Sequence, residues 1–410
     1  MRRQADLPCF LADTWWFGLT GRLDDDRFRQ LVSRRAQQGF TAAQIVVGIP
    51  PEVGPAHPSA QSSVGAAWDL HGVPNEAYLR MARTRIEVMN RHGLTAIVYG
   101  GWGPQIEWIG VAAMTAWWRR IVETCDDLDV VYCLTGELDL CTSPFSARAL
   151  FPARSTDDLF GSWLGLGSIR RYAWAVGRRL APIGLARRRA GWSAVLNDLA
   201  GRTDRPVIVH TSAQIDGFGA VNDDGLLAAD TIQTGHSRSS EGELWRRLLA
   251  IRAAHPDRAV ANLEPWYEGI TGQFWLEDQV RAMWMSVGAG ATALCYGAQG
   301  IWNVGDGSFL AHWGTQSFDE AIDLATPAVL GATYRMLVDL GALSWPEGRA
   351  TVEGNRLVML RRADAPNRYL EYYPDARDVP ANARGQAFDP LTGRFTSTTP
   401  RTGQIVLVVS

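Results

Sequence analysis

The chain has 410 residues, of which 46% are hydrophobic and 20% charged. This length suits a barrel of about 250–350 residues with a small appended domain. The formal net charge of -3 offers no argument for a nucleic acid or a membrane surface as partner. All 40 basic residues are arginine, and the absence of lysine excludes Schiff-base, pyridoxal and Walker-type chemistry.

Short apolar runs alternate with longer amphipathic stretches along most of the chain. The runs that predict buried strands are 10–17, 41–49, 94–101, 130–136, 206–211, 229–234, 259–264 and 292–297. The stretches that predict helices are 24–38, 75–92, 112–125, 192–201, 241–254 and 276–288. Such alternation is typical of parallel strands with crossover helices, and eight units favour an α/β fold of the (β/α)8 TIM barrel type over residues 1–346.

Two segments break this alternation. A long insertion at about 138–191 separates the fourth strand from the fifth, and it ends in arginine clusters such as Arg187-Arg188-Arg189. We interpret these arginines as a solvated helix face or an oligomer contact. The tail, 349–410, loses helical periodicity, and short apolar runs at 350–361, 368–373 and 404–409 predict a small C-terminal β-sandwich domain without any catalytic group.

The start of the chain carries no apolar segment of the kind that a signal peptide needs, and no 18-residue apolar span occurs elsewhere. The sequence therefore predicts a soluble, cytoplasmic protein with no membrane partner and no nucleic-acid partner. The oligomeric state stays open, a homo-oligomer included.

Residues at the C-terminal ends of barrel strands face the active site. At these positions the chain has acids, amides, imidazoles and large rings. Sugars need polar partners for their hydroxyls and flat rings for their C–H faces, so this mixture predicts a carbohydrate substrate. The residues predicted to bind it are Asp13, Trp16, Trp102, His210, Gln233, His236, Tyr267, Tyr296, Gln299 and Trp302.

Two glutamates end apolar runs, Glu137 after 130–136 and Glu264 within 259–264. A carboxylate at the end of a buried strand is costly unless it has a function. Strands four and seven lie across the mouth of an eight-stranded barrel, so the pair can flank one anomeric carbon. We predict Glu137 as the acid/base and Glu264 as the nucleophile of a retaining glycosidase, with hydrogen bonds from Tyr267 or His236 keeping Glu264 ionised. Such a mechanism needs no cofactor and no metal.

Several of these motifs together resemble the apiosidase-like glycoside hydrolases, a family also described as a domain of unknown function followed by a domain to which collagen binding is attributed. The motifs are Asp13-Thr14 with Trp16, Gln233-Thr234-Gly235-His236, Leu263-Glu264-Pro265 with Tyr267-Glu268, and Tyr296-Gly297 with Gly300-Ile301-Trp302. The resemblance covers most of 9–345, and the tail with Phe388-Asp389-Pro390-Leu391-Thr392-Gly393 is similar to the second domain.

This resemblance implies a (β/α)8 barrel with paired acids on strands four and seven. It also implies an apiose-like, furanosidic or related sugar of a plant or bacterial glycan as substrate. The chain departs from the family pattern at three places: Thr135-Gly136-Glu137 stands where Gly-Gly-Asp is frequent, Ala298-Gln299 where His-Asn is usual, and Trp266 where a smaller or basic residue is frequent.

Two alternatives remain open. A metal-dependent hydrolase of the amidohydrolase type would use His210, His236 and Glu137 as ligands, although the first strand lacks an H-x-H and the chain lacks the lysine of binuclear sites. A catalytically inactive glycan-binding barrel would keep the aromatic platforms without using the glutamates.

Overall fold

The computed structural model describes residues 5–140, 167–344, 358–362, 365–400 and 402–409. Eight parallel strands form its central sheet: β1 (Phe10–Trp15), β2 (Ala42–Val46), β3 (Thr95–Tyr99), β4 (Val130–Cys133), β5 (Val207–Ile208), β6 (Ala229–Gln233), β7 (Ala259–Glu264) and β8 (Ala293–Cys295). Their order is β5-β4-β3-β2-β1-β8-β7-β6. The backbone N–H of Ala228 donates to the carbonyl of Val207 at 2.8 Å and thereby bridges the two end strands. The predicted TIM barrel is confirmed.

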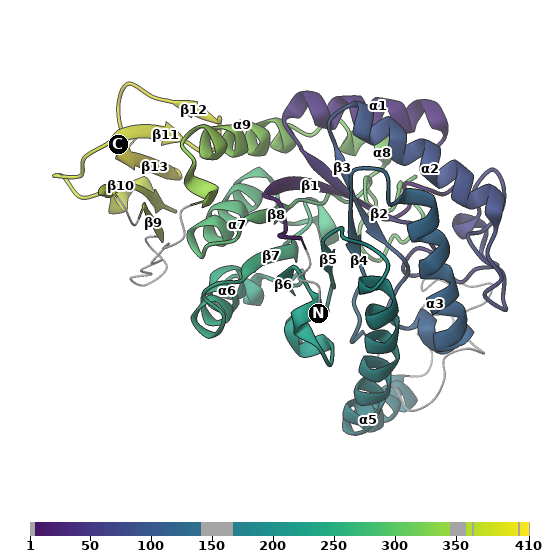
Figure 1. Ribbon diagram of the computed structural model, residues 1–410. Helices are drawn as coiled ribbons and strands as arrows, with labels where there is room; N and C mark the ends of the chain where they lie inside the picture. The colour runs from purple at the N-terminus through teal and green to yellow at the C-terminus, as the bar shows by residue number, and fades with distance from the viewer. Residues whose placement is uncertain (1–4, 141–166, 345–357, 363–364, 401, 410) are drawn as a thin grey trace.

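Helices surround this barrel (Figure 1). They are α1 (Asp25–Gln38), α2 (Glu76–Arg91), α3 (Gln105–Cys125), α5 (Gly167–Ala200), α6 (Glu243–Ala254), α7 (Leu276–Gly288), the short α8 (Phe318–Ala321) and α9 (Thr326–Asp339). The side chains of Asp24 and Asn75 cap the first turns of α1 and α2, which explains where these helices begin. The predicted helix at 192–201 is the end of the much longer α5, so part of the predicted insertion is helical. Residues 141–166 of the insertion lie outside the described residues.

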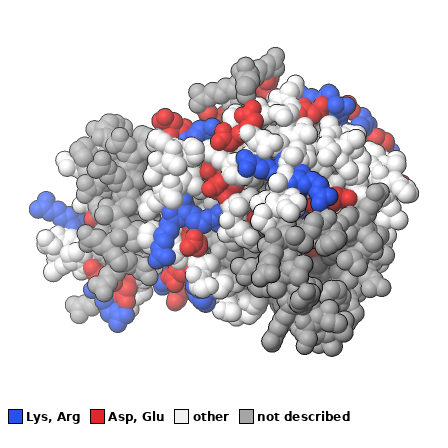
Figure 2. Space-filling model, turned by 90° about the horizontal axis from the view of Figure 1, so that it is seen from below, with Lys and Arg blue, Asp and Glu red and all other residues white. Residues whose placement is uncertain are grey.

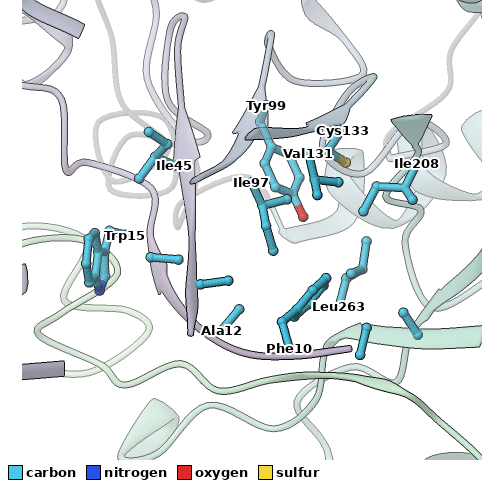
Figure 3. Packing of buried hydrophobic residues seen from close by; sticks show 14 of the residues in the cluster. Phe10, Ala12, Trp15, Ile45, Ile97, Tyr99, Val131, Cys133, Ile208 and Leu263 are labelled. Carbon is cyan, nitrogen blue, oxygen red and sulfur yellow. The ribbon is translucent and has the colours of Figure 1, made fainter. Parts of the chain in front are cut away.

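Successive side chains along a strand point to opposite faces of the sheet, and this alternation decides which of them fill the barrel interior. Figure 3 shows Phe10, Ile97 and Leu263 pointing toward one another, while Trp15 and Ile45 point away from this group. Position 10 and position 15 differ in parity on the same strand, so they face opposite sides of the sheet. All five residues are at most 2% exposed, because helices cover the outer face as well.

A polar layer lies among these apolar side chains. The amide nitrogen of Gln44 donates to the hydroxyl of Thr14 at 2.8 Å and to the carbonyl of Leu263 at 3.0 Å, while the hydroxyl of Tyr99 donates to the amide oxygen of Gln44. All three side chains of this network are fully buried. The network therefore fixes the backbone of β7 immediately before Glu264.

The tail forms an antiparallel sheet of β9 (Val358–Arg362), β10 (Ala365–Tyr373), β11 (Gln386–Asp389), β12 (Arg394–Phe395) and β13 (Ile405–Val409), in the order β12-β11-β13-β10-β9. It lies beside α7 and α9 (Figure 1). Tyr372 stacks on Trp284 of α7 with ring centroids 5.8 Å apart. The predicted small β domain is confirmed. Its described residues form one sheet, and α7 packs on the side where the second sheet of a sandwich would lie. The boundary predicted at 346–349 lies outside the described residues.

Charged side chains are mixed on the surface. On the face in Figure 2, arginines alternate with aspartates and glutamates. Many charged side chains of the described residues form pairs, as in the 2.7 Å contact between Arg83 and Asp127. Within the described ranges, none of the helices has the length and apolar character needed to cross a membrane.

Candidate active site

A cavity of about 150 Å³ opens where the carboxyl ends of the barrel strands meet. Most of the predicted site residues line it: Trp16, Trp102, Glu137, Gln233, His236, Glu264, Tyr267 and Trp302. The structure thus brings both predicted catalytic glutamates to one cavity, together with four of the five predicted aromatic residues.

Glu137 lies four residues after the end of β4, in the left-handed backbone region with φ of 40°. The indole N–H of Trp102 donates to its Oε2 at 3.0 Å. Gly136 makes this contact possible, because a Cβ at that position would come within 2.3 Å of the Trp102 ring. The glycine at position 136 therefore allows the carboxyl of Glu137 to lie against the indole of Trp102.

The loop after Glu137 is held from two sides. Asp139 is buried and accepts hydrogen bonds from both the backbone N–H and the hydroxyl of Ser212, each at 2.6 Å. Arg188 of α5 donates to the carbonyls of Leu138 and Leu140. Because its side chain is only 1% exposed, the interpretation of this arginine as part of a solvated face is wrong. It anchors the loop that carries the predicted acid.

Glu264 ends β7 and is 6% exposed. Its Oε1 accepts from the amide of Gln233 at 3.0 Å and contacts Nε2 of His236 at 2.9 Å. Nδ1 of His236 accepts from the backbone N–H of Tyr267 at 3.4 Å, so Nε2 carries the proton and donates to the carboxylate. Nε2 of His210 lies 3.4 Å from Oε2.

The environments of the two glutamates push their pKa values in opposite directions. Burial and then the charge of Glu264 raise the pKa of Glu137 to about 8, against the opposing hydrogen bond from Trp102. Burial alone would also raise the pKa of Glu264, but the hydrogen bond from His236 and the nearby His210 hold it below its usual range. Burial lowers the pKa of His210 itself. At neutral pH one carboxyl is therefore protonated and the other ionised, which is how acid and base roles are divided in such sites.

Aromatic rings form much of the cavity wall. Trp16 packs edge-to-face on Trp102 with ring centroids 5.1 Å apart, and it stacks on His210 behind the wall. The indole N–H of Trp302 donates to the side-chain oxygen of Gln299 at 2.9 Å. Gln299, predicted to bind substrate, does not line the cavity and instead orients Trp302. His210 likewise lies behind the wall, against Glu264.

Two further predicted binding residues, Asp13 and Tyr296, point away from the cavity. Asp13 forms an ion pair with Arg35 of α1 at 2.6 Å, and both side chains are fully buried. The hydroxyl of Tyr296 donates to the carboxylate of Glu268. Strand ends do not all face the mouth, because alternate residues point outward toward the helices. These two predictions were wrong for that reason.

Sequence reasoning missed part of the wall. Glu52, Trp313, Pro51, Leu140 and Ile270 also line the cavity. They lie on long loops after β2, β4, β7 and β8, where neither periodicity nor a strand end marks them. Backbone strain in the structure marks these loops, although nothing in the sequence does. The non-glycine residues with positive φ in the described part all lie on loops that follow barrel strands, and they are Glu52, Glu137, Thr271, Phe274, Val304 and Leu310. Such strain gathers at functional sites.

The metal-hydrolase alternative pairs Glu137 with His210 and His236. Both imidazoles approach Glu264 instead. Across the ranges that the structure describes, no three or more His, Cys, Asp or Glu side chains are grouped as metal ligands.

A family model described as the apiosidase-like catalytic domain matches residues 1–340. The sequence finds no match among curated proteins. Among solved structures, a protein named glycoside hydrolase has a TM-score of 0.70 at 14% identity, over 98% of this chain and 92% of that one. A family 5 glycoside hydrolase from Bacteroides vulgatus ATCC 8482 has a TM-score of 0.69 at 15% identity, over 98% and 89%. At these identities the two structures show a shared fold.

Proposed function

Given that the chain belongs to the apiosidase-like glycoside hydrolases, we propose that it cleaves a glycosidic bond with retention of configuration, using Glu137 as acid/base and Glu264 as nucleophile. One observation carries this proposal: the carboxyl groups of Glu137 and Glu264 line one cavity, and their surroundings raise the pKa of Glu137 and lower that of Glu264. A retaining glycosidase needs one protonated and one ionised carboxyl on the two sides of the anomeric carbon.

In the first step, the carboxylate of Glu264 attacks the anomeric carbon while Glu137 gives its proton to the departing oxygen. The products are a covalent glycosyl ester on Glu264 and the free alcohol. In the second step, the carboxylate of Glu137 takes a proton from water as that water attacks the same carbon. The ester bond breaks, the sugar leaves with its original configuration, and both carboxyls regain their starting protonation.

The neighbours of Glu264 support its role as nucleophile. Gln233 and His236 both donate to Oε1, so the orientation of the carboxylate is set before substrate enters. Their hydrogen bonds also stabilise the charge that an attacking carboxylate needs.

We further propose an apiose-like, furanosidic or related sugar as substrate. Family membership suggests it, and the size of the cavity is consistent with it. At about 150 Å³ the cavity is smaller than the roughly 300–1,000 Å³ of sites for drug-sized ligands, and four tryptophans among the described residues line it. A single sugar ring between indole faces fits such a space.

The test is a panel of aryl glycosides that includes pentofuranosides and apiosides, with wild type and Glu264→Ala assayed side by side. Turnover by wild type alone supports the proposal, and NMR of the first product formed should show retained configuration. An inverted product would mean that Glu264 activates water, with the carboxyls roughly 6.5–9.5 Å apart. Sugar binding without turnover of any member would favour the inactive glycan-binding barrel.

We expect activity to survive exhaustive chelation, because two carboxyls and water suffice for this reaction. The measurement is the rate on the best aryl glycoside before and after dialysis against EDTA, followed by addition of zinc or manganese. Loss of activity with chelator and its return with metal would instead support the metal-dependent alternative.

The pH dependence of kcat/KM should be bell-shaped. Activity should fall as pH rises through about 8, where Glu137 loses the proton that it must donate. It should also fall at a pH below the usual range of glutamate, where Glu264 becomes protonated. In Glu137→Gln, measured on an activated substrate, the alkaline limb should disappear and the acidic limb should stay. An unchanged alkaline limb in this variant would assign the acid to another group.

A further inference from the structure

A third carboxylate lines the cavity that holds Glu137 and Glu264. Glu52 lies on the loop after β2, and its side chain is 20% exposed. The indole N–H of Trp313 donates to its Oε1 at 3.3 Å, and Nε2 of His312 lies 3.9 Å from its Oε2. Both partners come from the loop after β8, so this carboxylate joins two loops at the cavity wall.

The backbone at Glu52 is strained. Its φ is 68°, a region that non-glycine residues seldom occupy. It follows Pro50-Pro51, whose rings restrict the path of the chain. Of the positive-φ residues other than glycine in the described part, Glu52 and Glu137 are the two that line the cavity. Strain that is kept at a cavity wall and aims a charged side chain inward is typical of a functional residue.

The chemistry of the wall indicates what Glu52 would recognise. A carboxylate offers about four acceptor positions, and the hydroxyls of a sugar are donors. Among the described residues, no arginine lines the cavity, and the sequence has no lysine. A sugar that carries its own negative charge would therefore meet carboxylates without an arginine or lysine at the wall to offset them.

We propose that Glu52 determines specificity: it accepts hydrogen bonds from hydroxyls of the sugar in the cavity, and its charge excludes anionic sugars such as uronic acids. This inference rests on the proposed glycosidase function and adds to it a substrate class of uncharged or cationic sugars.

The test compares Glu52→Gln and Glu52→Asp with a matched control, Glu76→Gln. Glu76 lies in the first turn of α2, pairs with Arg120 at the surface and does not line the cavity. Kinetics use the best aryl glycoside of the panel. Binding is followed by tryptophan fluorescence, because four indoles of the described residues line the cavity. The probes for binding are neutral and anionic sugars of one stereochemistry, D-glucose against D-glucuronate and D-galactose against D-galacturonate.

In Glu52→Gln we expect KM to rise about tenfold, since a hydrogen bond to a charged group contributes roughly that factor or more, while kcat changes much less. The preference of the wild type for the neutral member of a pair should shrink by about fivefold or more, as expected for the loss of one nearby charge. Glu76→Gln should match wild type in both measurements. Glu52→Asp keeps the charge, so it should keep the discrimination against uronates and lose affinity for the neutral sugar.

Three outcomes would overturn the inference: equal behaviour of Glu52→Gln and Glu76→Gln, a fall in kcat at constant KM, or equal affinity of the wild type for the neutral and the anionic sugar of a pair. If Glu52→Gln does not fold, as judged by circular dichroism, Glu52→Asp alone decides through its affinity for the neutral sugars. Binding does not require turnover. A wild type that binds but does not cleave therefore contradicts the proposed function alone, and a wild type that cleaves while Glu52→Gln equals the control contradicts only this inference.

Discussion

Replacing Glu264 by alanine is expected to abolish turnover of every glycoside that the wild type cleaves. No covalent intermediate can form without the carboxylate, and the methyl group of alanine cannot activate water in its place. The rate should fall by roughly 10⁴–10⁶-fold, as it does when a nucleophile that acts together with other catalytic residues is removed. Since Gln233 and His236 donate to this carboxylate, its loss also leaves one buried and one partly buried donor without their acceptor. The melting temperature should therefore be measured beside the rate.

Glu268→Gln is the matched control for this change. Glu268 follows on the same segment and is 2% exposed, but its carboxylate accepts from Tyr296 and Thr326 outside the cavity. A glutamine can still accept one of these hydrogen bonds, so this variant should melt earlier than wild type and keep its kcat. Residual activity of Glu264→Ala above about a hundredth of wild type, or an equal loss in Glu268→Gln, would place the nucleophile elsewhere.

Most of the barrel could be predicted because most of its strands are rich in apolar residues and end abruptly. The run at 259–264 stops at Pro265, and that at 229–234 is followed by Gly235. These signals are local. The start of α3 at Gln105 was missed because Gly110 interrupts it with a φ of 85°. The length of α5 was hidden in a segment whose arginines look like a surface pattern, and burial of Arg188 depends on carbonyls from a distant loop.

The candidate site was predictable where a costly residue stands at a strand end, as for Glu137 and Glu264. The site was not predictable where the direction of a side chain decides whether it reaches the cavity. Asp13 and Thr14 are neighbours, and only the register of β1 against β2 decides that Asp13 turns toward α1. An acid in a loop, such as Glu52, is ordinary in a sequence. Its position at the cavity wall depends on how the loops after β2 and β8 meet.

Replacing Glu137 by alanine is expected to harm poor leaving groups most. A general acid typically contributes about 10²–10⁴-fold, so losses of that size should appear on natural linkages and on aryl glycosides with a basic phenol. A dinitrophenyl group departs without protonation, so the first step on that substrate should be nearly as fast as in wild type. The glycosyl-enzyme would then accumulate, because no base remains to activate water.

Azide provides the second part of this test. As a small nucleophile that needs no base, it can enter the space left by the side chain and attack the ester on Glu264 from the face that water uses. The product should be a glycosyl azide with retained configuration, and the rate of Glu137→Ala should rise with azide concentration. Any azide product of Glu264→Ala should instead have inverted configuration, because azide then attacks the anomeric carbon directly in a single displacement. Equal losses in both variants on activated and natural substrates alike would contradict the separate roles. In that case the raised pKa of Glu137 would reflect only its burial and the nearby charge of Glu264.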